Sequence, residues 1–284
     1  NDSTSTGTAV LLTGSLLVNH TGSGTTILNG VNTYTGATTI NAGTLRVNGS
    51  NANSATTVNA GGPLGGTGTV GSVNVSGGTL APGNSIGTTT VTGNVDFTGG
   101  GNYNVEVDAA GNTDLINARG TATLTGGIVN LKPASGTYAL STDYTILTAS
   151  GGLGGTTFDS VNSNLAFLTP TLSYDANNVF LTLIRNSTNF ASVASTPNQT
   201  AVATVMDSNP TGVSDIVNNL LSLSSTDAQQ AFESLSGIQH AGAQTAVQKQ
   251  NSQFNRVLSS RFGGLTNSTV ASFNPLAGLL LAYN

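Results

Sequence analysis

The sequence predicts an all-β fold, a right-handed parallel β-helix, on two observations. In residues 24–49, GTTILNGVNTYTGATTINAGTLRVNG, apolar residues alternate with Thr and Asn, and Gly recurs every few positions. This pattern is typical of short half-buried strands joined by tight turns. The second observation is a repeat, because Ile40, Val58, Val75 and Val91 stand 18, 17 and 16 residues apart in similar Thr/Val/Asn-rich strands. Such a step predicts one solenoid coil per repeat, since a single coil cannot bury its apolar side alone.

The composition supports a folded solenoid of low charge. Of the 284 residues, 37% are apolar and only 7% are charged, and 37 are Gly. Low charge with much glycine is also typical of disorder, but the apolar residues here are periodic, which favours a fold. The formal net charge is −5, and the seven Lys and Arg form no basic run. No nucleic acid is therefore expected as a partner, because phosphate binding needs clustered positive charge.

Cysteine usage and hydropathy exclude several further classes of protein. The chain contains no cysteine, which excludes disulfides and thiolate metal sites. No stretch reaches about 18 consecutive apolar residues, so no membrane-spanning helix is expected. The first ten residues, NDSTSTGTAV, show neither the basic nor the apolar region of a signal peptide. We therefore expect such a leader to be absent or already removed.

Residues 1–137 are predicted to form the β-helix coils, with residues 10–18, VLLTGSLLV, as an opening pair of strands. Glycine supplies the positive φ values that sharp corners need, and Val, Ile and Leu pack well between stacked strands. The residues expected to point inward are Ile40, Leu45, Val58, Val75, Leu80 and Val91.

Residues 138–185 are predicted to form a cap on the β-helix. Aromatic residues are denser here, and the expected strands TYAL, YTIL, NLAFL and VFLTLI are more apolar than the coils before them. The open end of a solenoid exposes its core and unpaired backbone groups, which a denser terminal unit covers. The expected aromatic anchors are Phe158, Phe167, Tyr174 and Phe180.

Residues 186–262 are predicted to be helical, because the apolar period changes from two to about 3.6 residues. Thr196 and Gln199 have the spacing of a capping box, with Pro197 at the first helical position. Pro210 is expected to end this helix.

A second apolar stripe follows, and Thr226 and Gln229 form another candidate capping box ahead of a later helix. Residues 263–284, GGLTNSTVASFNPLAGLLLAYN, are left as a flexible or unassigned tail.

Several of these segments resemble one known family. The segment NTYTGATTINAGTL (32–45) is similar to the passenger-associated transport repeat of bacterial autotransporters, the type V secreted proteins. Residues 64–97 resemble coils near the C-terminal end of such a passenger, and residues 144–183 resemble its autochaperone cap. The segments STPNQTAVATVMD and AQQAFESLSG resemble the helical linker toward the translocator.

The resemblance implies the C-terminal part of a passenger, located at the bacterial cell surface, attached to the outer membrane, or secreted. It also implies a translocator β-barrel as a partner. No series of strands of about ten residues follows residue 262, so we expect this barrel to be absent from the chain. The lack of cysteine suits a protein that crosses the periplasm unfolded.

The motif Gly83-Asn84-Ser85-Ile86-Gly87 matches G-x-S-x-G, the pattern around a hydrolase nucleophile. A nucleophile elbow needs a strand, a strained turn, a helix and a His base. Here the motif lies between two expected solenoid strands, and the two histidines, His20 and His240, are far apart in sequence. We therefore interpret the motif as a corner turn, and His240 as a residue of helix packing.

Three carboxylates, Glu106, Asp108 and Asp114, cluster in NVEVDAAGNTD and could bind Ca²⁺ through oxygen ligands. Their spacing matches neither an EF-hand loop nor the nonapeptide of calcium-binding β-rolls. A structural or solvent-facing role is the favoured interpretation, with Glu106 and Asp108 on one strand face. Asp159 and Asp175 are interpreted as turn residues.

No basic patch emerges from Arg46, Arg119 and Arg185, which are widely separated in sequence. These motifs supply no catalytic, cofactor-binding or metal-binding residues, and we expect neither a cofactor nor an enzymatic activity.

The predicted function is that of an adhesin or self-association stalk in host interaction. Its partners would be a host cell surface, the matrix or neighbouring bacterial passengers, and the assignment rests largely on the resemblance. One alternative is a non-catalytic stalk and secretion segment for an upstream enzyme. Another is a released effector that binds a host receptor.

Overall fold

A computed structural model describes residues 11–139, 141–209, 214–237 and 248–257. The chain divides into two compact units, residues 1–232 and residues 233–284. The first unit holds all the labelled strands, and in the second unit residues 248–257 are helical.

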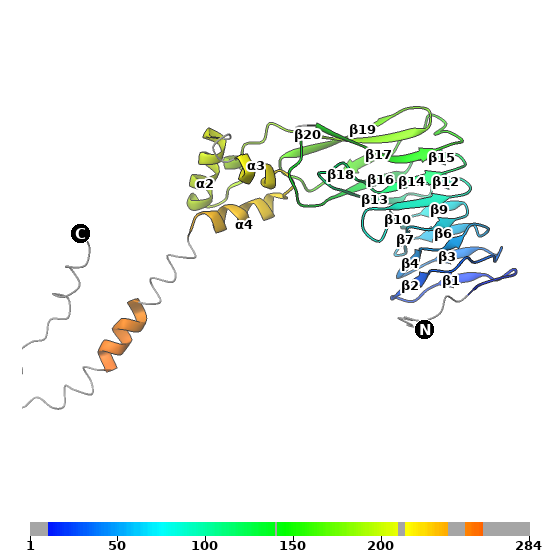
Figure 1. The fold of residues 1–284 in the computed structure, drawn as a ribbon, viewed down its shortest axis with the longest axis horizontal. Coiled ribbons are helices and arrows are strands. Elements are labelled where there is room, and N and C mark those ends of the chain that lie inside the picture. Colours follow the sequence, from blue (N-terminus) through cyan, green and yellow to red (C-terminus); the bar gives the residue numbers. More distant parts are fainter. Residues whose placement is uncertain (1–10, 140, 210–213, 238–247, 258–284) are drawn as a thin grey trace, which may run out of the picture. The chain divides into compact units, whose positions relative to one another are not determined.

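Three sheets form the first unit, and each full coil gives one strand to each sheet (Figure 1). Sheet A contains β1 (Val18–His20), β3 (Thr38–Ile40), β6 (Thr56–Asn59), β9 (Val73–Ser76), β12 (Val95–Asp96) and β15 (Ala122–Thr123). Sheet B contains β2 (Thr25–Leu28), β4 (Thr44–Val47), β7 (Pro63–Gly66), β10 (Thr79–Pro82), β13 (Gly101–Val107), β16 (Gly127–Pro133) and β18 (Ser160–Asn162). Sheet C contains β5 (Ser50–Asn51), β8 (Thr69–Val70), β11 (Thr88–Val91), β14 (Leu115–Ala118), β17 (Ser141–Ala149), β20 (Asn178–Arg185) and β19 (Leu168–Tyr174). The molecule is the capped parallel β-helix that the sequence predicts.

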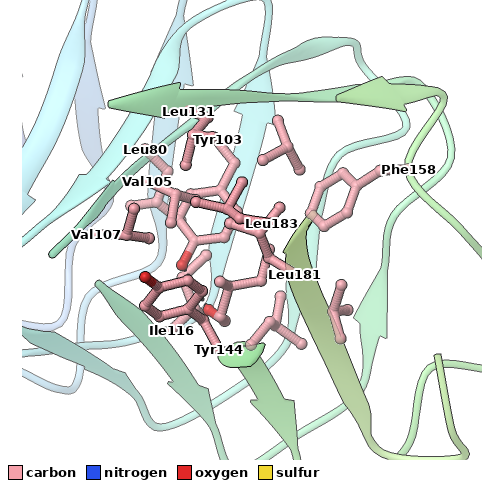
Figure 2. Packing of buried hydrophobic residues seen from close by; sticks show 14 of the residues in the cluster. Leu80, Tyr103, Val105, Val107, Ile116, Leu131, Tyr144, Phe158, Leu181 and Leu183 are labelled. Carbon is pink, nitrogen blue, oxygen red and sulfur yellow. Dashed lines mark hydrogen bonds between the residues drawn. The ribbon is translucent and has the colours of Figure 1, made fainter. Parts of the chain in front are cut away.

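The core consists of columns of apolar side chains that run from coil to coil. In sheet B, Leu45, Leu64, Leu80, Tyr103 and Val129 occupy successive partner positions, and none is more than 1% exposed. Figure 2 shows Leu80 and Tyr103 among the side chains that fill the space between the strands. All six residues that were expected to point inward are buried, which confirms the predicted core.

The predicted repeat is confirmed for three of its four members. Ile40, Val58 and Val75 are aligned partners in sheet A. The assignment of Val91 to the same column is wrong, because Val91 lies in sheet C opposite Val70. The next strand of sheet A is β12, since a longer corner separates β10 from β11. The number of residues between two positions therefore predicts that they stack in the same sheet only where every coil has the same length.

Ladders of asparagine line the edges of the coils. The Asn41 side-chain amide donates to Asn19 Oδ1 at 2.8 Å, and the Asn59 amide donates to Asn41 Oδ1 at 2.8 Å. A second ladder joins Asn29, Asn48 and Asn84 through contacts of 3.1 and 3.0 Å. Each amide can donate to one coil and accept from the next, so one residue type can repeat along a solenoid and still keep further donor and acceptor sites.

The solenoid ends in an antiparallel hairpin. Strand β17 extends sheet C in the parallel sense, but β20 pairs antiparallel with β17, and β19 pairs antiparallel with β20. The buried aromatic residues of this end are Tyr138, Tyr144, Phe158 and Phe167, each at most 5% exposed. The ring of Phe158 meets Phe97 edge-on at 5.3 Å, which joins the cap to the coil below.

Two details of the predicted cap are wrong. The segment TYAL is not a strand over its described residues 137–139, and in NLAFL only Leu168 belongs to a strand. Phe180 is also only half-buried, as is Tyr174. The inward positions of β20 are Val179, Leu181 and Leu183, because alternation along the strand turns Phe180 to the opposite face.

Short helices follow the cap: α1 (Phe190–Val193), α2 (Pro197–Ser208), α3 (Ser214–Leu220) and α4 (Ser225–Leu235). The capping box of Thr196 and Gln199 is present, with Pro197 at the first helical position. The second candidate box is wrong, because the Ser224 hydroxyl accepts from the backbone N–H of Asp227 at the start of α4. Gln229 instead donates to the carbonyl of Val193.

The remaining sequence-based expectations are either wrong or concern residues outside the described part of the chain. The opening strand pair expected at residues 10–18 is wrong for the described part, where Val18 alone is in a strand. His240, Pro210 and the tail 263–284 lie outside the described residues.

A charge in the core columns should be far more costly than a charge on the outer face. We expect Val58→Asp to lower the free energy of unfolding by roughly 3–5 kcal/mol, because it buries an unpaired carboxylate. The control Thr57→Asp, on the outward face of the same strand, should stay within about 0.5 kcal/mol. Urea unfolding followed by circular dichroism measures both. Equal losses in the two variants would contradict the inward column.

Residues 138–185 should be the most stable part of the chain, because they combine buried aromatic rings with the most apolar strands. Hydrogen exchange should show greater amide protection there than in residues 25–100. A chain that lacks residues 138–185 should refold slowly and aggregate. Higher protection in residues 25–100, or equally fast refolding without the cap, would refute this prediction.

Candidate functional site

A polar depression lies on the outer face of sheet B, and we name it the sheet B hollow. It has a volume of about 210 Å³. Gly65 and Ala81 line it, and charged side chains on neighbouring strands contribute Arg46, Glu106 and Lys132. Because side chains alternate along each strand, these outward residues face away from the core column of the same sheet.

The hollow exists because the strands between the charged ones carry small residues. A Cβ added at Gly65 would lie 3.0 Å from the carbonyl oxygen of Ala81 and 3.8 Å from Arg46 Cγ. The Arg46 guanidinium reaches past this position, and its Nη1 donates to Asn84 Oδ1 at 3.2 Å. A larger side chain at Gly65 would therefore crowd the neighbouring backbone and Arg46.

Asp114 is a buried carboxylate beneath the same face, only 1% exposed. Its Oδ1 accepts from the backbone N–H of Gly87 at 2.9 Å, and its Oδ2 accepts from that of Glu106 at 2.8 Å. Burial raises the pKa of Asp114 to about 7, although these two N–H groups pull the pKa down. Asp114 thus ties the corner after β10 to strand β13, a role that its sequence context did not indicate.

The three clustered carboxylates do not converge. Glu106 is on the outward face of β13, as predicted. The prediction that Asp108 shares this strand face is wrong, because β13 ends at Val107 and Asp108 begins the turn that follows. The Asp108 carboxylate accepts from the Asn112 side chain and backbone, and these hydrogen bonds lower its pKa. Among the described residues, no three His, Asp or Glu side chains lie close enough to hold a metal ion.

The G-x-S-x-G motif is a corner between β10 and β11, as predicted. Gly83 has a φ of 84° and exchanges backbone hydrogen bonds of 2.9 Å with Gly66. Ser85 is exposed on this corner. His20 lies in β1, where its ring nitrogens contact the carbonyl of Ala42 at 2.7 Å and the hydroxyl of Thr26 at 3.1 Å.

The predicted turn residues are confirmed. The Asp175 carboxylate accepts from the backbone N–H groups of Asn177 and Asn178 in the turn between β19 and β20. Asp159 Oδ1 accepts from the backbone N–H of Gly126 and so links two successive corners.

Arg185 forms a clamp between the cap and the helices. Its guanidinium lies 5.4 Å from the ring centre of Phe167 and 5.3 Å from that of Phe190. It also donates to the carbonyls of Phe167, Asn186 and Thr188. Burial lowers the pKa of this guanidinium from its usual value. Arg185 is thus structural, and of the three arginines discussed only Arg46 lines the hollow.

A larger depression, which we name the cap groove, adjoins the hollow. It has a volume of about 600 Å³ and lies between β16, residues 162–164 and residues 222–227. Asn104 and Lys132 line both depressions. Sequence reasoning missed the cap groove, because its walls come from segments about ninety residues apart.

Comparisons with known proteins identify the class. A family model described as passenger-associated-transport-repeat matches residues 20–47. Two extracellular serine proteases of Serratia marcescens are 39% and 32% identical to this chain over 197 and 198 residues, which is 66% of this chain. The adhesin BmaC autotransporter of Brucella suis biovar 1 is 47% identical over 87 residues, 29% of this chain and 2% of the adhesin. The chain spans only 19% of the length of each Serratia protein.

The transport repeat, the matches to the Serratia proteases and the Brucella autotransporter adhesin, and the stacked coils together support a passenger region of a bacterial autotransporter. Its location is the cell surface or the secreted fraction. Within the described part of the chain, no helix has the length and hydrophobicity needed to cross a membrane.

Asp114 should make stability depend on pH. Its pKa rises from 3.8 in the unfolded chain to about 7 in the folded chain, so the folded chain keeps a proton that the unfolded chain has released. Stability from this group should therefore fall as pH rises from about 4 to about 7, by at most about 1.4 kcal/mol per pH unit. Urea unfolding across this range should show that Asp114→Asn removes this slope.

The control for this prediction is Asp108→Asn. Because the pKa of Asp108 is lowered, its linkage to stability lies below about pH 4. Asp108→Asn should therefore parallel the unchanged protein between about pH 4 and 7. A difference between Asp114→Asn and the unchanged protein that stays constant over this range would contradict the assignment.

Proposed function

We propose that this chain is an adhesive or self-associating stalk that holds repeated polar surfaces away from the bacterial cell. The observation that carries the proposal is the pair of Asn ladders, which repeat amide donors and acceptors along the stack of coils. Asn19, Asn41 and Asn59 lie on successive coils, whereas the second ladder skips the coil of β7 between Asn48 and Asn84. A surface of this kind can make many weak hydrogen bonds at once, so modest contacts add up to useful avidity. The proposed partners are host cells, matrix and neighbouring passengers.

The comparisons support a scaffold role for this part of a passenger. Stretches of this chain align with proteins that are named a serine protease and an adhesin. Stretches of one passenger region thus occur in differently named proteins, which supports a mechanical task for this region. The stalk itself would serve this task, whatever activity the rest of each protein has.

The test uses beads that carry the purified chain of residues 1–284. Such beads should cluster with each other or adhere to host cells, and the clustering should weaken in Asn41→Lys, which places a charge on an Asn ladder. Asn53→Lys is the matched control, because it changes the net charge equally at an exposed position outside both ladders. Beads that neither cluster nor bind cells would refute the proposal.

A second candidate is a stalk and secretion segment for an enzyme encoded upstream. The match to the Serratia serine proteases favours it, since that match covers more of this chain than the match to the adhesin. The full reading frame decides between the candidates, because a catalytic motif upstream of residue 1 would support the second. In either case residues 1–284 should hydrolyse no ester or peptide. Esterase activity that Ser85→Ala abolishes would overturn both.

A further inference from the structure

The sheet B hollow and the cap groove adjoin each other, and we propose that together they form one track that binds a linear, uncharged oligosaccharide. The two depressions share Asn104 and Lys132, so a ligand can pass from one to the other. The track crosses the strands from β4 to β18, five steps in sheet B. At about 4.8 Å per step it is about 24 Å long, which suits an extended chain of several sugar residues.

Amide side chains cross this track in register. Asn104, Asn130 and Asn162 are aligned partners on successive strands. The Asn130 amide donates to Asn104 Oδ1 at 3.3 Å, and the Asn162 amide donates to Asn130 Oδ1 at 3.3 Å. Asn164 adds a further amide to the lining. An amide offers two donor hydrogens and an acceptor oxygen, which match the donor and acceptor character of sugar hydroxyls.

The charges along the track are mixed. Arg46 and Lys132 are cationic, whereas Glu106, Asp114 and Asp227 carry carboxyl groups. Neither sign forms the continuous field that concentrates a charged polymer. The lining therefore favours an uncharged chain over a nucleic acid or a sulfated polysaccharide.

A buried hydroxyl supplies a second, independent observation. Ser222 lines the cap groove and is 9% exposed, and its Oγ has no hydrogen-bond partner among the described residues. A buried hydroxyl without a partner costs free energy, so a rotation of this side chain toward the groove would let a ligand hydroxyl recover that cost. This end of the track is thus built for a polar ligand.

The groove is less suited to an extended peptide. Strand β18 pairs only with the first half of β16, so Lys132 and Pro133 stand at an unpaired edge. Proline has no N–H to give to an added strand, and lysine at an edge opposes strand addition. Sugar hydroxyls bind to side chains and do not need this edge.

The affinity should be weak for a single site. The residues that line the two depressions include no aromatic ring for a sugar to stack on, so binding rests on hydrogen bonds. Many copies of the chain on one cell would raise the overall avidity above the affinity of a single site. This inference therefore rests on the proposed surface role, to which it adds a ligand class.

Ligand-observed saturation-transfer NMR on the full chain tests the inference. Maltohexaose, cellohexaose and chitohexaose serve as neutral probes, with a heparin hexasaccharide and a Ser/Asn-rich peptide as competing classes. At least one neutral probe should receive saturation at millimolar concentration. The paired change Asn162→Ala and Asn164→Ala should weaken its binding about tenfold, as the loss of one or two hydrogen bonds does. Asn117→Ala, an exposed Asn on sheet C, should leave binding unchanged.

A filling variant tests whether the track is continuous. Ala81→Phe should block the hollow and weaken binding of a hexasaccharide more than that of a disaccharide. The inference is overturned if no neutral probe binds, if only the heparin fragment or the peptide binds, or if Asn117→Ala has the same effect as the groove variants. Beads that still cluster or adhere without glycan binding would leave the stalk proposal intact. Glycan binding without clustering or adhesion would refute the stalk proposal alone.

Discussion

The whole fold depends on each coil burying the apolar face of the next. A single coil before the cap has strands of only two to seven residues, too short to form a core by itself. Once stacked, Leu45, Leu64 and Leu80 exclude water from each other, and the parallel ladder fixes their register. The corners, the hollow and the cap are all positioned by this stacking.

Stacking also explains why the chain carries so little charge. Equivalent outward side chains on adjacent coils are only about 4.8 Å apart, so a repeated Lys or Glu would repel its own copies. A repeated Asn gains a hydrogen bond instead, as Asn19, Asn41 and Asn59 do. Where charges do occur on sheet B, opposite signs are neighbours, since Glu106 is aligned with Lys132. The 7% charged content is thus a consequence of the architecture.

From the sequence, one can predict whether a side chain points inward more reliably than which residues of other coils lie next to it. Alternation of period two correctly turned Ile40 and Val58 inward, because it depends only on the strand itself. Val91 was assigned to the wrong sheet, because column membership depends on the length of every corner before it. In β20 the expectation that Phe180 is an anchor rests on its aromatic ring alone, whereas alternation along the strand buries Val179, Leu181 and Leu183.

The sheet B hollow shows more clearly that the sequence does not reveal which residues of different coils lie together. Arg46, Glu106 and Lys132 are far apart in the chain, and no local pattern joins them. They meet only because the coils bring β4, β13 and β16 onto one face, with small residues between. Asp114 was recognised as a carboxylate near a turn, but its burial depends on Gly87 in the preceding coil.

The reversal of strand direction at the cap limits how copies of this molecule can assemble. Parallel stacking requires that an added strand run the same way as its neighbour, yet β19 and β20 form an antiparallel hairpin. Another coil cannot continue sheet C in its parallel pattern beyond this hairpin. Head-to-tail polymerisation into an endless filament, the hazard of any repeating structure with open edges, is therefore blocked at the cap.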